Sequence, residues 1–139
     1  MKKFQFRLQK VLDYRRAMEE RAQDAYLDSR VARLEAEAAV AAVDVRRRTL
    51  LSSNQQDLSF RQTLELMLLS LDDEERQKKV VVEVLADEER KALQAWQEKK
   101  QELEALVKLR EKAEAEYGIE LNRYEQAQLD EWTVQRREA

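Results

Sequence analysis

The chain has 139 residues, of which 40% are charged and 43% hydrophobic, and it contains no Pro, no Cys, no His and a single Gly. This composition is typical of long helices and coiled coils, because it supplies apolar surface for a two-helix interface but not for a thick globular core. The lack of Cys and His excludes disulfides, thiolate metal sites and histidine-based catalysis. The net charge of -3 provides no overall positive field for nucleic acid or an anionic membrane.

The N-terminal residues are not expected to form a secretion signal. Lys2 and Lys3 give a basic start, but Arg7, Lys10 and Asp13 interrupt the apolar stretch that such a signal needs. No window of the sequence approaches the apolar length of a membrane span, so we expect no direct membrane insertion. Because the absence of cysteine also permits a reducing compartment, the sequence predicts a soluble, cytoplasmic protein.

The first predicted element is a long helix over residues 4–51. Apolar residues, mostly alanine, recur every three or four positions from Phe4 to Val43. A second apolar stripe runs beside the first and is expected to let this helix contact more than one element. This second stripe consists of Leu27, Val31, Leu34, Ala38, Ala41 and Val45. The basic run 46–48 suits the negative end of a helix dipole, so we expect the helix to end near Leu51.

A connection and a short helix are predicted over residues 52–71. Polar cap-forming residues dominate from Ser52 to Ser59, and Ser59 with Gln62 has capping-box spacing. Four apolar residues of the short helix share one stripe, while Leu66 and Leu69 point elsewhere. The stripe consists of Phe60, Leu64, Met67 and Leu71. Two interpretations remain open: one side is exposed to a partner, or all of these residues form a small core at the tip.

The last predicted element is a helix over residues 72–137. Ser70 and Asp73 again have capping-box spacing, and the acidic run 72–75 suits the first turn of a helix. Sixteen positions then follow one another by three and four residues, as in one strand of a coiled coil. These are Val82, Leu85, Glu89, Ala92, Trp96, Lys99, Leu103, Leu106, Arg110, Ala113, Tyr117, Glu120, Tyr124, Ala127, Glu131 and Val134.

The two long helices are expected to pair within one chain. An antiparallel hairpin sets the alanine-rich helix against the Trp- and Tyr-rich one, so that small residues meet large ones. The expected register places Leu8 near Tyr124, Arg15 near Tyr117, and Ala36 near Trp96. A parallel homodimer is the alternative, which a solution mass measurement would reveal. The predicted fold is thus all-α, a single elongated domain over residues 1–139, monomeric when free: two long helices in an antiparallel coiled-coil hairpin with a short helical segment at the tip.

Charged residues within the predicted helix interface recur every twenty-one positions, at Glu89, Arg110 and Glu131. Either they fix the register by pairing with polar residues such as Arg15, or they extend outward into solvent. Neither these nor the abundant carboxylates indicate catalysis, because serines lack a His base and a carboxylate-bridged metal site requires Glu-x-x-His. We expect a non-enzyme with no catalytic residue, no metal and no cofactor.

Two motifs resemble those of a known family. The stretch from Phe4 to Arg15, Phe-Gln-Phe-Arg-Leu-Gln-Lys-Val-Leu-Asp-Tyr-Arg, resembles the start of the flagellar export protein FliJ family, and Gln126-Ala-Gln-Leu-Asp-Glu131 resembles its closing Gln-x-x-Leu-Asp-Glu pattern. The resemblance covers essentially the whole chain. The stalk proteins of virulence type III secretion systems are close relatives, so either system remains open.

The resemblance implies a cytoplasmic stalk of the flagellar type III export apparatus, associated peripherally with the inner membrane, with three kinds of partner: the export ATPase hexamer, the cytoplasmic domain of the export-gate membrane protein, and export chaperones. The implied gate contact consists of Phe60, Leu64, Met67 and Leu71. The implied contact with the ATPase ring consists of Phe4, Phe6, Leu8, Gln9, Leu12, Arg15, Leu129, Asp130, Glu131, Arg136 and Arg137, which would lie together at one end of the hairpin.

A competing interpretation is a generic structural coiled coil or a chaperone adaptor. Such a protein would bind substrates or chaperones without any effect on ATP turnover. The stalk interpretation predicts instead that the purified protein raises the hydrolysis rate of the ATPase and binds the gate domain.

Overall fold

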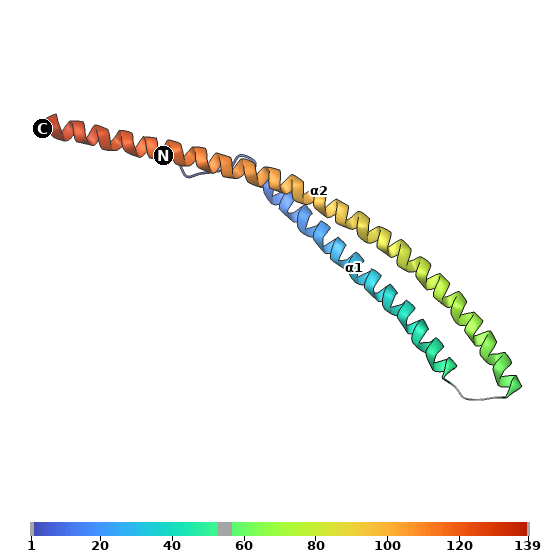
Figure 1. The fold of residues 1–139 in the computed structure, drawn as a ribbon. Coiled ribbons are helices and arrows are strands. Elements are labelled where there is room, and N and C mark those ends of the chain that lie inside the picture. Colours follow the sequence, from blue (N-terminus) through green and yellow to red (C-terminus); the bar gives the residue numbers. More distant parts are fainter. Residues whose placement is uncertain (1, 53–56, 139) are drawn as a thin grey trace. The chain divides into compact units, whose positions relative to one another are not determined.

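The computed structural model describes residues 2–52 and 57–138, which form two helices and, within these ranges, no strand (Figure 1). Helix α1 comprises Gln9–Leu51, 43 residues, and helix α2 comprises Leu58–Glu138, 81 residues. Such long helices are possible because the chain has no proline to interrupt the backbone hydrogen bonds and is rich in residues of high helix propensity. The predicted all-α fold is confirmed.

Helix α1 begins five residues later than predicted, at Gln9 instead of Phe4. The backbone N–H of Gln9 donates to the carbonyl oxygen of Phe6 over 3.1 Å, in a turn that precedes the helix. At its other end, the hydroxyl of Ser52 donates to the carbonyl oxygen of Thr49 over 2.8 Å and satisfies one of the last free carbonyls. Most of the predicted connection falls on residues 53–56, which lie outside the described residues.

The predicted short helix is not a separate element, because α2 continues without a break from Leu58 through residues 71 and 72. Its N-cap is Asp57, not Ser59: an Asp57 carboxylate oxygen accepts a hydrogen bond from the backbone N–H of Ser59 over 3.3 Å. The predicted cap at Ser70 does not begin a helix. No Gly or Pro interrupts this stretch, and the acidic residues that follow Ser70 pair with α1 instead of capping a helix end.

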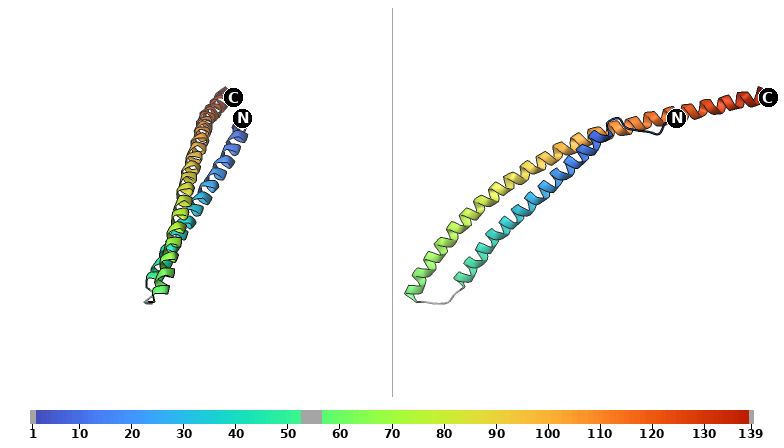
Figure 2. Two further views of the ribbon diagram at one scale, coloured as in Figure 1. Left: turned by 90° about the vertical axis from the view of Figure 1, so that its right-hand side faces the viewer. Right: turned by 180° about the vertical axis from the view of Figure 1, so that it is seen from behind.

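Contacts divide the chain into two compact units, one of which consists of residues 21–96. In this unit α1 and α2 lie side by side and run antiparallel (Figure 2). The ring of Tyr26 stacks on that of Trp96 with centroids 5.5 Å apart, Arg33 pairs with Glu89, and Arg46 pairs with Glu74. Residues later in α1 thus pair with residues earlier in α2, as an antiparallel hairpin requires.

The other unit consists of residues 1–20 and 97–139, and it is also antiparallel. A guanidinium nitrogen of Arg15 lies 2.7 Å from a carboxylate oxygen of Glu102. Further along α2, the Nε of Arg110 donates to the side-chain oxygen of Gln9 over 3.0 Å. Leu12 is fully buried in this unit. The predicted antiparallel pairing is therefore confirmed in each unit, while the single-domain organisation stays a prediction.

The predicted register is wrong in both units. Trp96 stacks on Tyr26, not beside Ala36, ten positions further along α1. Tyr117 lies against Phe4 instead of Arg15, and Leu8 borders a groove with Ala113 instead of lying near Tyr124. The physical reason is that α2 begins at Leu58. A separate tip helix would have occupied residues that instead belong to α2, so every partner on α2 comes earlier than expected.

The regular pattern of α2 predicts its inward face correctly as far as Tyr117. All eleven predicted positions from Val82 to Tyr117 are half-buried, whereas the predicted positions from Glu120 to Val134 are exposed. In α1 the prediction is partly wrong, because Val11 and Ala25 are exposed. The inward positions there are one residue later, at Leu12 and Tyr26. The second predicted stripe of α1, from Leu27 to Val45, is exposed and contacts no second element within the described residues.

Candidate partner-binding surfaces

The segment after the interhelical connection forms the first candidate surface, and the structure separates its four predicted gate-contact residues. Leu71 is 7% exposed and belongs to the core, so it offers a partner little surface. Phe60 and Leu64 are half-buried, whereas Met67 is exposed. A shallow groove beside this helix is lined by Arg46, Thr49, Leu50, Met67, Ser70, Leu71 and Glu74. One edge of this segment is thus core and another is open, so the interpretation that all of these residues form a small core at the tip is wrong, and contact with a partner stays a prediction.

Other apolar residues of this segment lie outside the groove. Leu58, Leu66 and Leu69 are exposed, as is Leu51 at the end of α1. A cluster of exposed apolar side chains at one place is uncommon on a monomer and typically marks a surface that another molecule covers.

Ion pairs between the two helices lie directly beside the groove. Arg46 lies 2.5 Å from Glu74, and Arg47 pairs with both Asp72 and Glu75. The hydrogen bond from Lys79, followed by that from Arg47, lowers the pKa of Glu75 to about 2. Lys78 and then Arg46 lower the pKa of Glu74 in the same way. Arg46 and Arg47 therefore pair with α2 as well as forming the basic end of α1. These ion pairs hold the two helices together next to the groove.

Two of the predicted charged interface residues also pair, although with unexpected partners. Glu89 accepts a hydrogen bond from Arg33, and Arg110 donates to Gln9. Arg15, the expected partner, binds Glu102 instead. Glu131 is exposed. The predicted pairing of such residues with polar residues of the other helix or its start is confirmed for Glu89 and Arg110, while their role in fixing the register stays a prediction.

Residues 2–8, here called the N-terminal strap, form the second candidate surface together with α2. The ring centroid of Phe4 lies 5.6 Å from that of Tyr117, and the guanidinium carbon of Arg110 lies 5.8 Å from the Phe4 centroid. An Arg above an aromatic face is attracted by the ring quadrupole. Phe6 and Leu8 are half-buried in the same region. The predicted ring-contact residues at the N-terminus therefore serve first to fasten the chain to α2.

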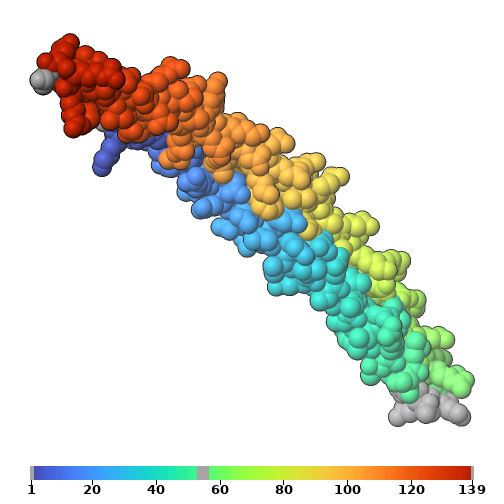
Figure 3. Space-filling view, turned by 60° about the vertical axis from the view of Figure 1, so that its left-hand side comes forward, coloured from blue at the N-terminus to red at the C-terminus, as the bar shows by residue number. Residues whose placement is uncertain are grey.

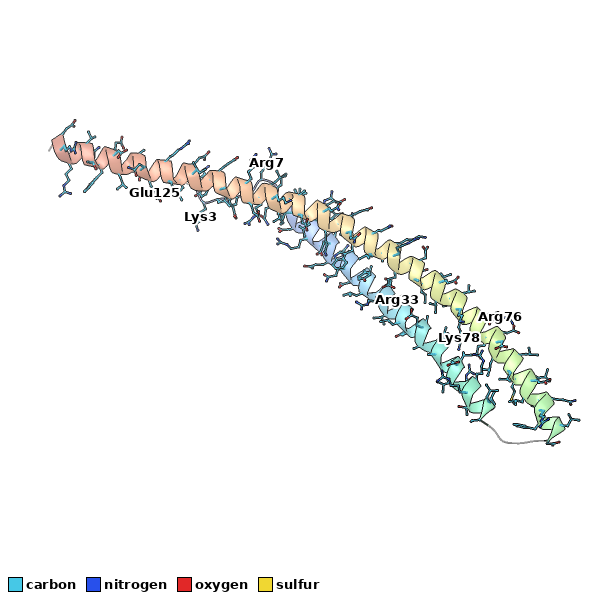
Figure 4. All side chains as sticks on the ribbon, viewed as in Figure 1. Lys3, Arg7, Arg33, Arg76, Lys78 and Glu125 are labelled. Carbon is cyan, nitrogen blue, oxygen red and sulfur yellow. The ribbon has the colours of Figure 1, made fainter. Side chains whose placement is uncertain are left out.

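The last part of α2, residues 122–138, here called the C-terminal arm, is exposed on every side. The red end of α2 extends past the blue N-terminal residues in Figure 3, and Figure 4 shows Glu125 further along α2 than Lys3. Leu129 is 57% exposed and Trp132 56% exposed, and the guanidinium carbon of Arg136 lies 5.0 Å from the Trp132 ring centroid. Such large apolar side chains on a single helix are suited to contact with another molecule.

The structure does not bring the two predicted ring-contact motifs together. The N-terminal strap meets α2 around Tyr117, twelve positions before Leu129. The predicted residues of the second motif all lie on the C-terminal arm: Leu129, Asp130, Glu131, Arg136 and Arg137. Leu12, a member of the first motif, is fully buried and therefore belongs to the core.

Sequence reasoning missed Trp132, and it assigned Tyr124 and Val134 to the helix interface although all three are exposed. The unequal lengths of the two predicted helices would have revealed these exposed residues. The described residues before the connection are fewer than those after it, so they cannot accompany α2 to its end once pairing begins at the start of α2.

Nothing in residues 2–52 and 57–138 indicates a metal centre or a membrane span. These residues contain no group of three or more Asp or Glu side chains arranged to hold a metal ion. The helices that they form include none that is both long and apolar enough to cross a membrane.

Comparison with known proteins gives a family. Residues 4–138 match the family model of the flagellar FliJ protein, which is nearly the whole chain. No curated protein and no solved structure matches the chain.

Proposed function

Because the chain belongs to the flagellar FliJ protein family, we propose that it is the stalk of the flagellar type III export apparatus. The family is a non-catalytic, export-related component of the flagellum. In this proposal the chain is cytoplasmic, associates with the inner membrane only through its partners, and performs no bond chemistry. It couples nucleotide-dependent changes in the export ATPase ring to the export gate.

The observation that carries this proposal is the C-terminal arm. A helix that no other described residue covers presents its whole circumference, as a shaft inside a ring of subunits must. The arm also carries the large exposed side chains of Leu129 and Trp132, and its last turn is basic at Arg136 and Arg137. Of the predicted ring-contact residues, we assign those on the arm to direct contact. Those on the N-terminal strap support the base of the arm, and Leu12 contributes by packing.

The gate contact is proposed at the groove beside the start of α2. Met67 supplies an exposed apolar side chain there, and Phe60 and Leu64 supply half-buried ones. Leu71 holds the groove in shape from the core. The ion pairs of Arg46 and Arg47 with α2 stiffen the unit of residues 21–96, and a closely packed pair of helices transmits displacement because it is poorly compressible.

The ring contact is tested by the hydrolysis rate of the purified export ATPase. We expect the wild-type protein to raise this rate, and Leu129→Glu and Trp132→Glu to reduce the effect strongly, because each places a charge in an apolar contact. Val84→Glu is the matched control, since Val84 is exposed on α2 outside the arm and away from the N-terminal strap. Absence of any stimulation by the wild-type protein overturns the proposal.

The gate contact is tested by binding to the purified cytoplasmic domain of the export-gate protein. Met67→Glu is expected to weaken this binding, while Val80→Glu, at an exposed apolar position of α2 beyond the groove, leaves it unchanged. Equal loss in both variants would contradict the assignment of the contact to the groove.

The alternative of a chaperone adaptor gives a different pattern. It predicts binding to export chaperones by a protein that leaves ATP turnover unchanged. Deletion of the gene decides between the two export systems, because loss of motility supports the flagellar assignment and loss of virulence secretion alone supports the other.

A further inference from the structure

In residues 21–51, helix α1 has two apolar faces. The face toward α2 is half-buried or buried and consists of Ala22, Tyr26, Ser29, Arg33, Ala36, Val40 and Val43. The second face, here called the outer stripe, consists of Leu27, Val31, Leu34, Ala38, Ala41 and Val45, all of which are exposed. At 3.6 residues per turn, the two faces point roughly 150° apart. The outer stripe is therefore turned away from α2 except at Ala41, which also borders a groove with Lys79 and Val82.

The outer stripe is more apolar than the face that α1 buries against α2. Leu27 is 44% exposed, Val31 53%, Leu34 46% and Val45 59%, while the inward face includes the polar residues Ser29 and Arg33. A helix with one partner normally carries charged residues on its outer side. A continuous apolar stripe over five turns instead indicates that a second molecule covers it.

The pattern of the outer stripe identifies that molecule. Its spacing of four, three, four, three and four residues is the same in both directions, with its centre at residue 36. A second copy in antiparallel orientation about this centre places its Ala38 beside Leu34, its Ala41 beside Val31, and its Val45 beside Leu27. Larger side chains thus face alanines in two of these three pairings, whereas a parallel copy stacks Leu34 on Leu34 and Ala38 on Ala38, with crowding in one layer and a gap in the next.

We propose that the outer stripe is the interface of a weak homodimer, in which a second copy of the chain packs its own outer stripe antiparallel against it. This dimer is additional to the stalk function, and it leaves the pairing of α1 with α2 intact. The expectation of a monomeric free protein then applies to dilute solution.

The charges beside the outer stripe predict how salt affects the dimer. Arg30 has no ion pair within the ranges that the structure describes, and the antiparallel arrangement places it near Asp44 of the second copy. Glu35 and Glu37, on opposite sides of the centre, each approach their own counterpart. Arg33 lies 2.9 Å from Glu37 and offsets part of that repulsion. Because attractive and repulsive charge pairs both flank the outer stripe and salt screens both, added salt is expected to change the dimer fraction little.

The size of the interface sets the concentration at which the dimer forms. The outer stripe contributes six residues per copy, far fewer than the roughly 20 to 30 of a standard stable interface. We therefore expect a monomer at about 5 µM and a substantial dimer fraction at about 500 µM, as for other small and transient contacts.

Sedimentation velocity of the full-length protein across this concentration range tests the proposal. We expect the mean mass to rise toward twice the monomer mass in the wild type and to stay monomeric in Leu34→Glu. Val84→Glu is the matched control, because Val84 is 53% exposed on α2 outside the outer stripe, and it is expected to dimerise like the wild type. A wild-type protein that stays monomeric throughout, or a dimer that persists in Leu34→Glu, overturns the proposal.

Disulfide cross-linking tests the orientation, and the absence of cysteine from the natural sequence makes the result unambiguous. Under mild oxidation, an equimolar mixture of Leu27→Cys and Val45→Cys is expected to yield cross-linked dimer that is lost in denaturant. Each variant alone is expected to yield at least tenfold less. Efficient cross-linking of Leu27→Cys to itself indicates a parallel contact and overturns the antiparallel arrangement.

Discussion

The phenolic hydroxyl of Tyr117 donates a hydrogen bond to the backbone carbonyl oxygen of Lys2, 115 positions earlier in the chain, over 2.5 Å. The same ring lies against Phe4, whose other neighbour is the guanidinium group of Arg110. Glu120, about one turn further along α2, still borders a groove with Lys2 and Phe4, and every residue from 122 to 138 is exposed. Tyr117 therefore lies about one turn before the end of the part of α2 that the N-terminal strap accompanies.

Removal of this hydroxyl in Tyr117→Phe is expected to loosen the strap while leaving the aromatic contact in place. The hydrogen bond is exposed, so its loss costs about 0.5 to 1 kcal/mol. We expect faster tryptic cleavage after Lys3 and Arg7. Tyr124→Phe is the matched control, because the Tyr124 hydroxyl accepts a hydrogen bond from Gln128 within the C-terminal arm. Unchanged cleavage in Tyr117→Phe would show that the strap is held by its rings alone.

Leu12→Ala is expected to destabilise the protein more than any change on the arm. Leu12 is fully buried, and removal of a buried leucine side chain costs roughly 2 to 5 kcal/mol, with the lower value more suitable for a two-helix interface that can relax. Leu129→Ala, at an exposed position, is expected to change the free energy of unfolding by less than about 0.5 kcal/mol. Urea unfolding followed by circular dichroism measures both. Similar midpoints for the two variants would contradict the burial of Leu12.

Acid is expected to weaken the hairpin near its connection. Lys79 and Arg47 lower the pKa of Glu75 from 4.5 to about 2, so the folded state binds this proton less readily than the unfolded state. The stabilisation is fully present above about pH 4.5 and is lost as the pH falls toward 2. Thermal unfolding between pH 6 and pH 2 shows this effect.

The matched pair for this pH effect is Glu75→Gln and Glu104→Gln. The first variant is expected to lower the melting temperature at pH 6 and to flatten its dependence on pH, because the group that titrates is gone. Glu104 is exposed and makes no ion pair in the part of the chain that the structure describes, so Glu104→Gln retains the wild-type dependence. A wild-type slope in Glu75→Gln would assign the acid sensitivity to other carboxylates.

Gly118→Ala is expected to stabilise α2. A Cβ at this position meets no atom within 4 Å, and alanine is favoured over glycine inside a helix by about 0.5 to 1 kcal/mol. Thermal unfolding followed by circular dichroism is expected to show a higher midpoint temperature for Gly118→Ala. Ala115→Gly, at an exposed position one turn earlier, is expected to lower this midpoint by a similar amount. Destabilisation by Gly118→Ala would indicate that the glycine serves close packing with another molecule.

The sequence was sufficient to predict the two long helices and the inward face of α2. A strict spacing of three and four residues places all of its apolar positions on one face of a helix. The pattern of α1 was ambiguous, since alanines such as Ala25 and Ala39 fit several stripes equally well. Burial of Leu12 and Tyr26, larger than the alanines, decided the inward face there.

The register and the candidate surfaces were harder to predict, and both depend on where α2 begins. Two capping boxes, at Ser59 and Ser70, offered two starting points, and the cross-helix pairing of Asp72, Glu74 and Glu75 with arginines outweighs the local signal at Ser70. A local pattern contains no information about such a distant partner. The error in register also concealed the bare C-terminal arm, because it assigned partners to Tyr124 and its neighbours.

The C-terminal arm, exposed throughout residues 122–138, is helical because the helix is already nucleated in the rest of α2. An isolated peptide of this length would have to form its first turn unaided, which is unfavourable, and would be largely unfolded in water. In α2 the turns around Tyr117 are already fixed by the strap, so each following residue adds only one propagation step. A partner that binds the arm therefore binds a preformed helix, so the arm loses little conformational entropy on binding.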